Sequence, residues 1–139
     1  MADQELYHSD LLAYAREHPM MHEKHQAAHV VKAYSPLCGD KFEIRFDLNG
    51  VFSGVSFFGY GCIVSTASTG LLAEILTGKS PMEARQLMQD YLDALRDSGN
   101  RVSDDPRFTQ LMVARKYPGR IQCAALAWEV CLDHTLFGG

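Results

Sequence analysis

The sequence of 139 residues is poor in several features, and each shortage excludes a class of protein. Its apolar stretches, around residues 51–58 and 121–130, are interrupted by polar residues and fall well short of the roughly 20 apolar residues of a membrane-spanning helix. Lysine and arginine number 13 against 17 aspartates and glutamates, so the chain lacks the basic excess that binds nucleic acid. Residues 1–7 lack the basic start and apolar run of a secretory signal. We therefore expect a cytoplasmic protein that binds neither a membrane nor nucleic acid.

Cysteine is also scarce, with four residues in the chain. In a reducing cytoplasm, four cysteines indicate metal binding or sulfur chemistry rather than a framework of disulfides. The length is close to that of the commonest single domains, and an apolar share of 47% is ordinary for a folded soluble protein. We expect one domain over residues 1–139.

The middle of the chain carries a β-hairpin signal. Residues 42–48 alternate apolar and polar side chains, which predicts a half-buried strand. Asn49-Gly50 follows, a dipeptide typical of two-residue hairpin turns, and Val51 to Phe58 is expected to be the return strand. Val30 to Tyr34 is β-branched at its start and is a candidate for a third antiparallel strand.

Helical periodicity covers most of the remaining sequence. We expect one helix between Ser9 and His18, one with an apolar stripe from Ile63 to Leu76 that Gly78 ends, and one that Ser80 and Glu83 cap. The stripe of this last helix comprises Met82, Leu87, Met88, Tyr91, Leu92 and Leu95. Pro106 is expected to start a short helix, and a final helix should begin after Tyr117-Pro118-Gly119 with Cys123 in its first turn.

Three histidines follow the first predicted helix. His22, His25 and His29 have helical spacing, so a helix there would place the three imidazoles on one face, where a second metal site is conceivable. No cysteine or paired carboxylate accompanies them, and histidine is common on solvated helix faces. We therefore interpret them as surface residues and leave them out of the site.

Three cysteines occupy positions that favour the thiolate form. Cys38 lies just before a strand, and Cys62 and Cys123 are expected at helix starts, where free amides and the helix dipole lower a thiol's pKa. Asp40 lies two residues after Cys38, so a carboxylate can reach the same centre. Three thiolates and one carboxylate are a sufficient set for tetrahedral zinc. The spacing alone leaves open a second interpretation, in which these cysteines are buried and inert, as we expect for Cys131 in its apolar run.

Three segments resemble the signature segments of the IscU/SufU family of iron-sulfur cluster assembly proteins. They are SPLCGD (35–40), GYGCIVSTAS (59–68) and PGRIQCAALAW (118–128), in the family's order and each around one proposed ligand. The resemblance implies an α+β fold, with a small three-stranded antiparallel sheet packed against several helices. It also implies that Cys38, Asp40, Cys62 and Cys123 bind the metal.

Details of the third segment are similar to the SufU branch of the family. The IscU branch has histidine immediately before the third cysteine, where this chain has Gln122, and the segment between Cys62 and Cys123 is longer here. The SufU branch implies a zinc-dependent sulfurtransferase, with Cys38 accepting persulfide sulfur from a pyridoxal-phosphate cysteine desulfurase of SufS type. Downstream cluster-assembly proteins would be further partners. Arg120 is then a candidate contact to the partner, although it could equally be an ordinary surface or capping cation.

The proposed acceptor chemistry has two competitors. In the acceptor mechanism, zinc protects Cys38 until a desulfurase side chain takes its place, and the freed thiolate attacks the partner's persulfide. In a scaffold, the same thiolates would hold a transient [2Fe-2S] cluster with Asp40 as an exchangeable ligand. In a structural zinc-binding interaction module, no sulfur would be transferred. Only the acceptor requires that the chain accelerate a cysteine desulfurase.

Overall fold

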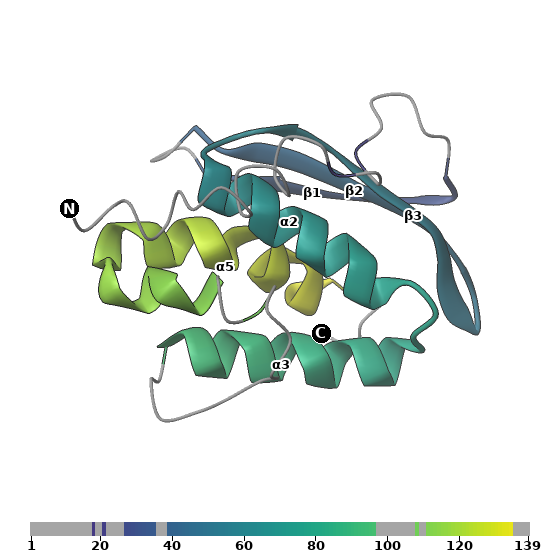
Figure 1. Cartoon of the computed structure of the whole chain (residues 1–139). Coiled ribbons are helices and arrows are strands. Elements are labelled where there is room, and N and C mark those ends of the chain that lie inside the picture. The colour runs from purple at the N-terminus through teal and green to yellow at the C-terminus, as the bar shows by residue number, and fades with distance from the viewer. Residues whose placement is uncertain are drawn as a thin grey trace.

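The computed structural model describes residues 18, 21, 27–35, 39–96, 108 and 111–134 (Figure 1). The helix expected between Ser9 and His18 lies outside these residues apart from His18 itself, and so do His22, His25 and Cys38. The predictions that rest on them therefore stay predictions.

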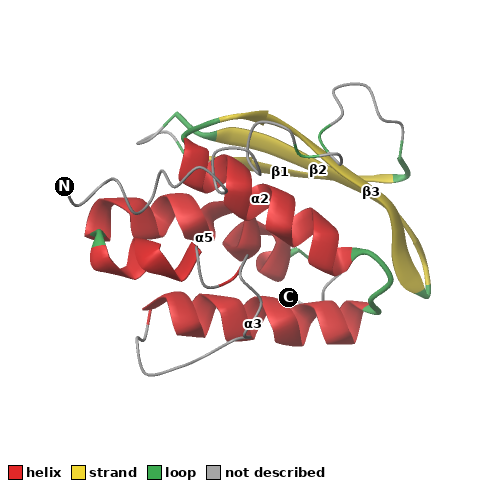
Figure 2. Cartoon of the chain, in the orientation of Figure 1, coloured by secondary structure: helices red, strands yellow, loops and turns green. Residues whose placement is uncertain are grey.

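A three-stranded antiparallel sheet forms one layer, in the order β1-β2-β3 (Figure 2). Its strands are β1 (His29–Tyr34), β2 (Lys41–Asn49) and β3 (Val51–Tyr60). The predicted hairpin is confirmed: Asn49 pairs with Val51, and Gly50 turns the chain with a φ of 80°, which glycine adopts without steric cost. The return strand is longer than expected and reaches Tyr60, next to the second cysteine motif.

Helices α2 (Ile63–Leu76) and α5 (Pro118–Asp133) lie beneath the sheet, and α3 (Pro81–Arg96) packs against α5 on the far side from the sheet (Figure 1). A short 3-10 helix, η2 (Val113–Lys116), precedes α5. The predicted end of α2 and the predicted start of α3 agree with the structure. Gly78, with a φ of 82°, follows α2, and Ser80 and Glu83 exchange backbone-to-side-chain hydrogen bonds at the start of α3. None of the described helices is long and apolar enough to cross a membrane.

The core lies between the sheet and the helices. Alternate residues of the strands point inward, as their period of two predicts, and meet the apolar faces of α2 and α5. The largest side chains that are fully buried are Trp128, Tyr91, Phe42, Phe46, Phe52, Phe57, Ile44, Leu71, Leu72 and Leu76. This shared core fixes α2 and α5 against the strand ends that carry the cysteine motifs.

Three expectations about local structure are wrong. His29 begins β1 and pairs with Phe46, so it does not continue a helix, because pairing of the β-branched residues after it decides its conformation. Met82 is 83% exposed, since six residues at 100° each place it about 120° around α3 from Met88, outside the buried face. Helix α5 starts at Pro118, whose ring suits the first helical turn, and Cys123 consequently lies in the second turn.

Candidate metal centre

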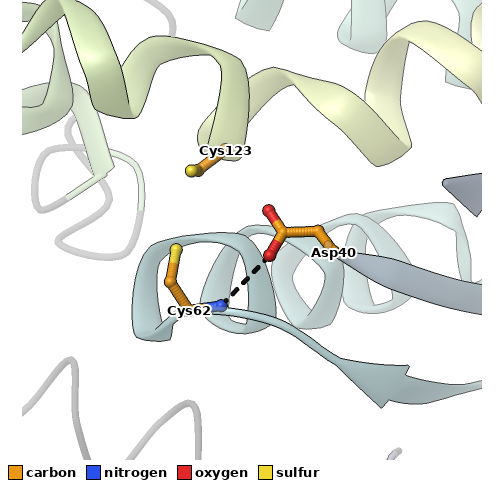
Figure 3. A group of neighbouring side chains, drawn as sticks. All are labelled: Asp40, Cys62 and Cys123. Atoms are coloured by element: carbon orange, nitrogen blue, oxygen red, sulfur yellow. Dashed lines mark hydrogen bonds between the residues drawn. The ribbon is translucent and has the colours of Figure 1, made fainter. Parts of the chain in front are cut away.

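Asp40, Cys62 and Cys123 come together from three separate elements (Figure 3). Asp40 immediately precedes β2, Cys62 follows β3 and caps α2, and Cys123 projects from α5. One ligand atom of each residue lies within 4.8 Å of the others. These are three of the four ligands that the sequence predicts. The fourth, Cys38, lies outside the described residues.

Cys62 is held by its own neighbours at the start of α2. Its sulfur accepts a hydrogen bond from the backbone N–H of Ser65 at 3.4 Å, so the thiol itself is the N-cap. Its carbonyl accepts from the hydroxyls of Ser65 at 3.1 Å and Thr66 at 2.9 Å. The pKa of Cys62 is lowered, chiefly by the hydrogen bond from Cys123 and then by the Ser65 amide. The direction of this shift agrees with the prediction that Cys62 favours the thiolate, although the helix start lowers the pKa less than the hydrogen bond from Cys123 does.

Cys123 differs from this expectation. Because it lies in the second turn of α5, no free helix-terminal amide reaches its sulfur, which instead lies 4.0 Å from the carbonyl of Gly119. Its pKa is raised, first because its thiol proton is held by the Cys62 sulfur, and further by burial and by the negative charges of Cys62 and Asp40. The thiol of Cys123 is therefore the donor, and the sulfur of Cys62 the acceptor, of the hydrogen bond between them. A cation between them would take the place of that proton.

Asp40 has one carboxylate oxygen engaged and one without a hydrogen-bond partner. The residue is 3% exposed, and its Oδ1 accepts a hydrogen bond from the backbone N–H of Cys62 at 3.3 Å (Figure 3). Its Oδ2 is buried and has no hydrogen-bond partner. Leaving a charged oxygen buried without a partner is costly, and a bound cation would remove that cost. The donor set of two sulfurs and this oxygen therefore fits a zinc ion.

Two glycines allow this close approach. A Cβ atom on Gly61 would lie 2.5 Å from Oδ1 of Asp40 and would also overlap the hydroxyl of Ser65. A Cβ atom on Gly59 would overlap the carbonyl of Lys41, and its φ of 154° also disfavours other residues. Gly61 therefore leaves room for the Asp40 carboxylate beside Cys62, and Gly59 lets the end of β3 approach the start of β2.

The cluster lines an open pocket. Besides Asp40, Cys62 and Cys123, the pocket is lined by Gly39, Tyr60, Gly61, Gly119 and Arg120. Arg120 also forms a hydrogen bond with Cys123 that lowers the pKa of this thiol, although the raising causes outweigh it. Sequence reasoning missed Tyr60, which is 64% exposed, and Gly119. Their positions inside the second and third cysteine motifs were the available signal.

Backbone hydrogen bonds join the two described ends of the loop that contains Cys38. The N–H of Gly39 donates to the carbonyl of Ser35 at 2.8 Å, and the N–H of Ser35 donates to the carbonyl of Asp40 at 2.9 Å. Cys38 directly precedes Gly39, which lines the pocket. Cys131, by contrast, is fully buried, and burial raises its pKa to about 12, in agreement with the expected inert core role.

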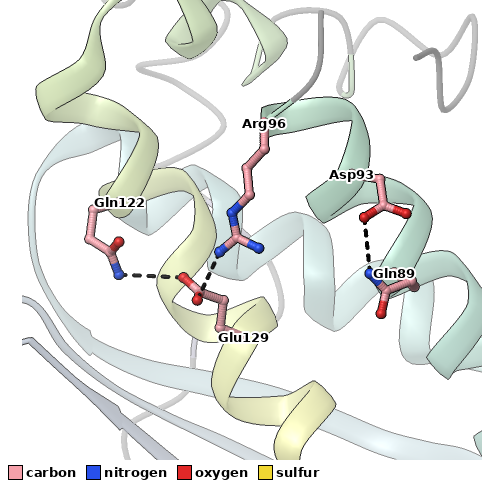
Figure 4. Close-up of polar contacts among 5 residues, drawn as sticks. All are labelled: Gln89, Asp93, Arg96, Gln122 and Glu129. Atoms are coloured by element: carbon pink, nitrogen blue, oxygen red, sulfur yellow. Dashed lines mark hydrogen bonds and ion pairs between the residues drawn. The ribbon is translucent and has the colours of Figure 1, made fainter. Parts of the chain in front are cut away.

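Gln122 is not among the residues that line the pocket. Its side-chain amide donates to Glu129 at 3.4 Å, and Glu129 in turn pairs with Arg96 of α3 at 2.8 Å (Figure 4). A second amide-to-carboxylate bond joins Gln89 to Asp93 along the exposed face of α3. The residue before the third cysteine therefore contributes no ligand atom to the centre.

Comparison with known proteins gives a consistent result. Residues 10–131 match the model of the NifU-like N-terminal domain. The chain is 29% identical to the iron-sulfur cluster assembly scaffold protein IscU of Streptococcus pyogenes, over 80% of this chain and 71% of that protein. It is also 29% identical to the zinc-dependent sulfurtransferase SufU of Bacillus subtilis, over 72% of this chain and 69% of that protein.

The fold is also that of a solved structure. A crystal structure described as a putative iron-sulfur cluster assembly scaffold protein for the SUF system, from Fervidobacterium islandicum, superposes with a TM-score of 0.79. The superposition covers 91% of this chain and 93% of that one, at 23% sequence identity. At this identity the likeness supports the fold alone, and it confirms the predicted α+β architecture.

Proposed function

Because this chain belongs to the family of NifU-like N-terminal domains, together with the IscU and SufU proteins of iron-sulfur cluster assembly, we propose that it is a zinc-dependent sulfur acceptor. Its partner in this proposal is a pyridoxal-phosphate cysteine desulfurase that presents sulfur as a persulfide. Cys38 accepts that sulfur and passes it on to later cluster-assembly proteins.

The observation that favours an acceptor over a cluster scaffold is the environment of Gln122. Its side chain bonds to Glu129 and does not line the pocket, so the donor set gains no nitrogen from this position. The set that remains consists of thiolates and one carboxylate. Such a set suits zinc, which accepts sulfur and oxygen ligands in a tetrahedron.

The chain's own residues would hold zinc through Cys62, Cys123 and the buried oxygen of Asp40, with Cys38 as the fourth ligand. When bound, zinc would keep these thiols deprotonated at neutral pH and join the loop of Cys38 to α2 and α5. Cys62 caps α2 and Cys123 lies within α5, whereas Cys38 belongs to a six-residue connection between β1 and β2. We therefore assign Cys38 as the thiolate that leaves most readily.

The transfer step is a thiol exchange with no net oxidation. The Cys38 thiolate attacks the outer sulfur of the partner's persulfide, a new sulfur–sulfur bond forms, and the bond to the partner's cysteine breaks. The partner's sulfur leaves as a thiolate. Arg120, at the rim of the pocket beside Cys123, has the charge and position to attract the anionic persulfide or an acidic group of the partner.

The test is a desulfurase assay with mass spectrometry. A cysteine desulfurase of SufS type and cysteine are incubated with the zinc-loaded protein, and both alanine production and the mass of the unreduced chain are measured. We expect faster turnover and added sulfur on Cys38. Cys38→Ala should abolish both effects while circular dichroism shows an intact fold.

Cys131→Ala is the matched control, because it removes a cysteine from the core and leaves the pocket unchanged. It should stimulate the desulfurase as the parent protein does. If persulfide accumulated on Cys123, or if Cys38→Ala stimulated the enzyme fully, the acceptor assignment would be wrong. If the parent bound zinc but had no effect on the desulfurase, a structural zinc module would be supported instead.

The second candidate function is a scaffold for a [2Fe-2S] cluster. It is favoured by the similarity to a protein named as an IscU scaffold over 80% of this chain, and by a pocket that is open to solvent. Anaerobic purification separates the two functions. Colourless protein with about one zinc per chain supports the acceptor, and brown protein with iron and sulfide in equal amounts supports the scaffold.

A further inference from the structure

A buried group of hydrogen bonds joins α2, α3 and α5 at Ala124, the residue that follows Cys123. Ser68 of α2 donates to the carbonyl of Ala124 at 2.6 Å, and the hydroxyl of Tyr91 of α3 donates to the same carbonyl at 2.9 Å. The indole N–H of Trp128 donates to the hydroxyl of Ser68 at 2.8 Å and to its carbonyl at 3.1 Å. We refer to Ser68, Tyr91, Ala124 and Trp128 as the Ser68 node.

Each side-chain donor of the Ser68 node has a hydrogen-bond acceptor within the node. Burial raises the pKa of Tyr91, so its hydroxyl keeps its proton and acts as a donor to Ala124. Ser68 accepts from Trp128 and donates to Ala124, and the rings of Tyr91 and Trp128 stack with their centroids 3.6 Å apart. Directional hydrogen bonds in a dry core define the relative position of two helices more narrowly than apolar contacts alone.

A displacement at the Ser68 node would move the segments that carry the sulfurs of Cys62 and Cys123. Ala124 directly follows Cys123 in α5, and Ser68 lies six residues after Cys62, about 9 Å along α2 at the rise of an α-helix. The bonds of Ser68 and Tyr91 end on the backbone next to Cys123. The Ser68 bond therefore fixes the segment that carries one sulfur to the helix that the other sulfur caps. Tyr91 holds both helices from α3, because its hydroxyl bonds to Ala124 and lies 3.3 Å from the hydroxyl of Ser68.

Tetrahedral zinc makes narrow demands on that separation. Two thiolates that each bind zinc at about 2.3 Å lie about 3.8 Å apart, so a shift of a few tenths of an ångström between α2 and α5 strains the site. We propose that Ser68 and Tyr91 are positioning residues of the metal centre, which set the distance between the sulfurs of Cys62 and Cys123. This inference rests on the proposed binding of zinc by these residues.

The alternative is that the node stabilises the core and has no specific effect on the metal. Thr69 gives a matched comparison, because it is the next residue of α2, is equally buried at 1% exposure and also carries a hydroxyl. Its hydroxyl bonds to Ser65 within α2 at 2.8 Å and so does not join two helices. Thr69→Val thus removes a buried hydroxyl bond that lies within α2, and Ser68→Ala removes bonds between helices.

The experiment compares the parent, Ser68→Ala, Tyr91→Phe and Thr69→Val. Zinc affinity is measured by competition with a chromophoric chelator, ligand geometry by the visible absorption of the cobalt(II) form, and stability by thermal unfolding of the metal-free proteins. We expect Ser68→Ala and Tyr91→Phe to weaken zinc binding about tenfold, in the range for residues that orient metal ligands, and to shift the cobalt bands. Thr69→Val should lose comparable stability and keep the parental affinity and spectrum.

The outcomes are distinguishable. If all three variants lost stability but retained parental zinc affinity and cobalt spectra, the node would be structural only and the inference would be overturned. The same conclusion would follow if Thr69→Val weakened zinc binding as much as Ser68→Ala. Should Ser68→Ala fail to fold, Tyr91→Phe, which keeps the stacked ring, decides between a positioning role and a purely structural role of the node. A parent protein that bound neither zinc nor cobalt would overturn the metal assignment itself, before any variant is compared.

Discussion

Cys62 and Cys123 face each other across one pocket, but different parts of the sequence hold them in place. Cys62 is held by Ser65 and Thr66, which lie three and four residues after it. Cys123 lies in the second turn of α5, and α5 is held at Ala124 by bonds from Ser68 and Tyr91, which are 56 and 33 residues away in the sequence. One sulfur is therefore positioned by local sequence and the other by tertiary packing. Each prediction below tests one side of this difference.

The largest expected effect comes from removal of either sulfur. Cys62→Ala and Cys123→Ala should each lose stoichiometric zinc and much of the stability that zinc adds, because structural zinc contributes up to about 10 kcal/mol of coupled binding and folding energy. Metal analysis and thermal unfolding with and without chelator measure both quantities. The hairpin and helices have a core of their own, so a folded but less stable protein should remain.

Cys131→Ala is the control for this pair. Its thiol is fully buried in α5 but lies outside the pocket, so it should lose on the order of 1 kcal/mol of stability and no zinc. If complete removal of zinc left the melting temperature of the parent unchanged, the expected contribution of zinc to stability would be wrong.

The next effect concerns the glycine that brings Asp40 to Cys62. Gly61→Ala would place a methyl group against the Asp40 carboxylate and the Ser65 hydroxyl, which should cost roughly 1–3 kcal/mol of stability and displace a ligand. Gly119→Ala is matched to it, since Gly119 lines the same pocket and a Cβ there meets nothing within 4 Å. Gly119→Ala should leave zinc affinity and stability near those of the parent. Equal losses in both variants would refute a specific role for Gly61.

Features that depend on residues close together in the chain could be predicted from the sequence. The hairpin at Asn49-Gly50, the helix start at Cys62 and the capping box at Ser80 are set by residues within a few positions of each other, so short patterns are enough to find them. The motif around Cys62 also carries the glycines that the close approach of Asp40 requires.

The environment of Cys123 depends on contacts between residues far apart in the chain, which no short sequence pattern contains. The start of α5 was misplaced because Pro118 and Gly119, which usually break a helix, here occupy its first turn. Cys123 was consequently expected to have a lowered pKa, whereas its position opposite Cys62 raises it. The Ser68 node was missed for the same reason, since its bonds join residues of three helices.

The opposite pKa shifts of the two thiols give a prediction for the metal-free protein. The pKa of Cys62 falls from 9.0 to about 5, so between these values the folded state binds fewer protons than the unfolded state, and stability should rise with pH across this window. The pKa of Cys123 is raised, so above its ordinary value the folded state holds a proton that the unfolded state releases, and stability should fall again. Urea unfolding of chelator-treated protein from pH 5 to pH 10 measures this dependence.

Cys62→Ser is the control for the pH dependence. It removes the group whose lowered pKa causes the rise and also the negative charge beside Cys123, so both the rise and the fall of stability with pH should become smaller. A parent protein whose stability changed with pH in the same way as that of Cys62→Ser would show that other groups cause the effect.

The smallest expected effect is that of Ser65→Ala, which tests whether Cys62 is held redundantly. The substitution removes the hydroxyl bond to the Cys62 carbonyl, but the backbone N–H of Ser65 still reaches the sulfur, and the hydroxyl of Thr66 still reaches the same carbonyl. Stability should fall by about 1 kcal/mol or less, the usual net worth of one hydrogen bond, and zinc affinity should stay within about threefold of the parent. Ser68→Ala is the same substitution three residues later, where the lost bonds join two helices. A loss of zinc affinity in Ser65→Ala as large as that in Ser68→Ala, measured by the same chelator competition, would show that local and tertiary contacts position the two sulfurs equally.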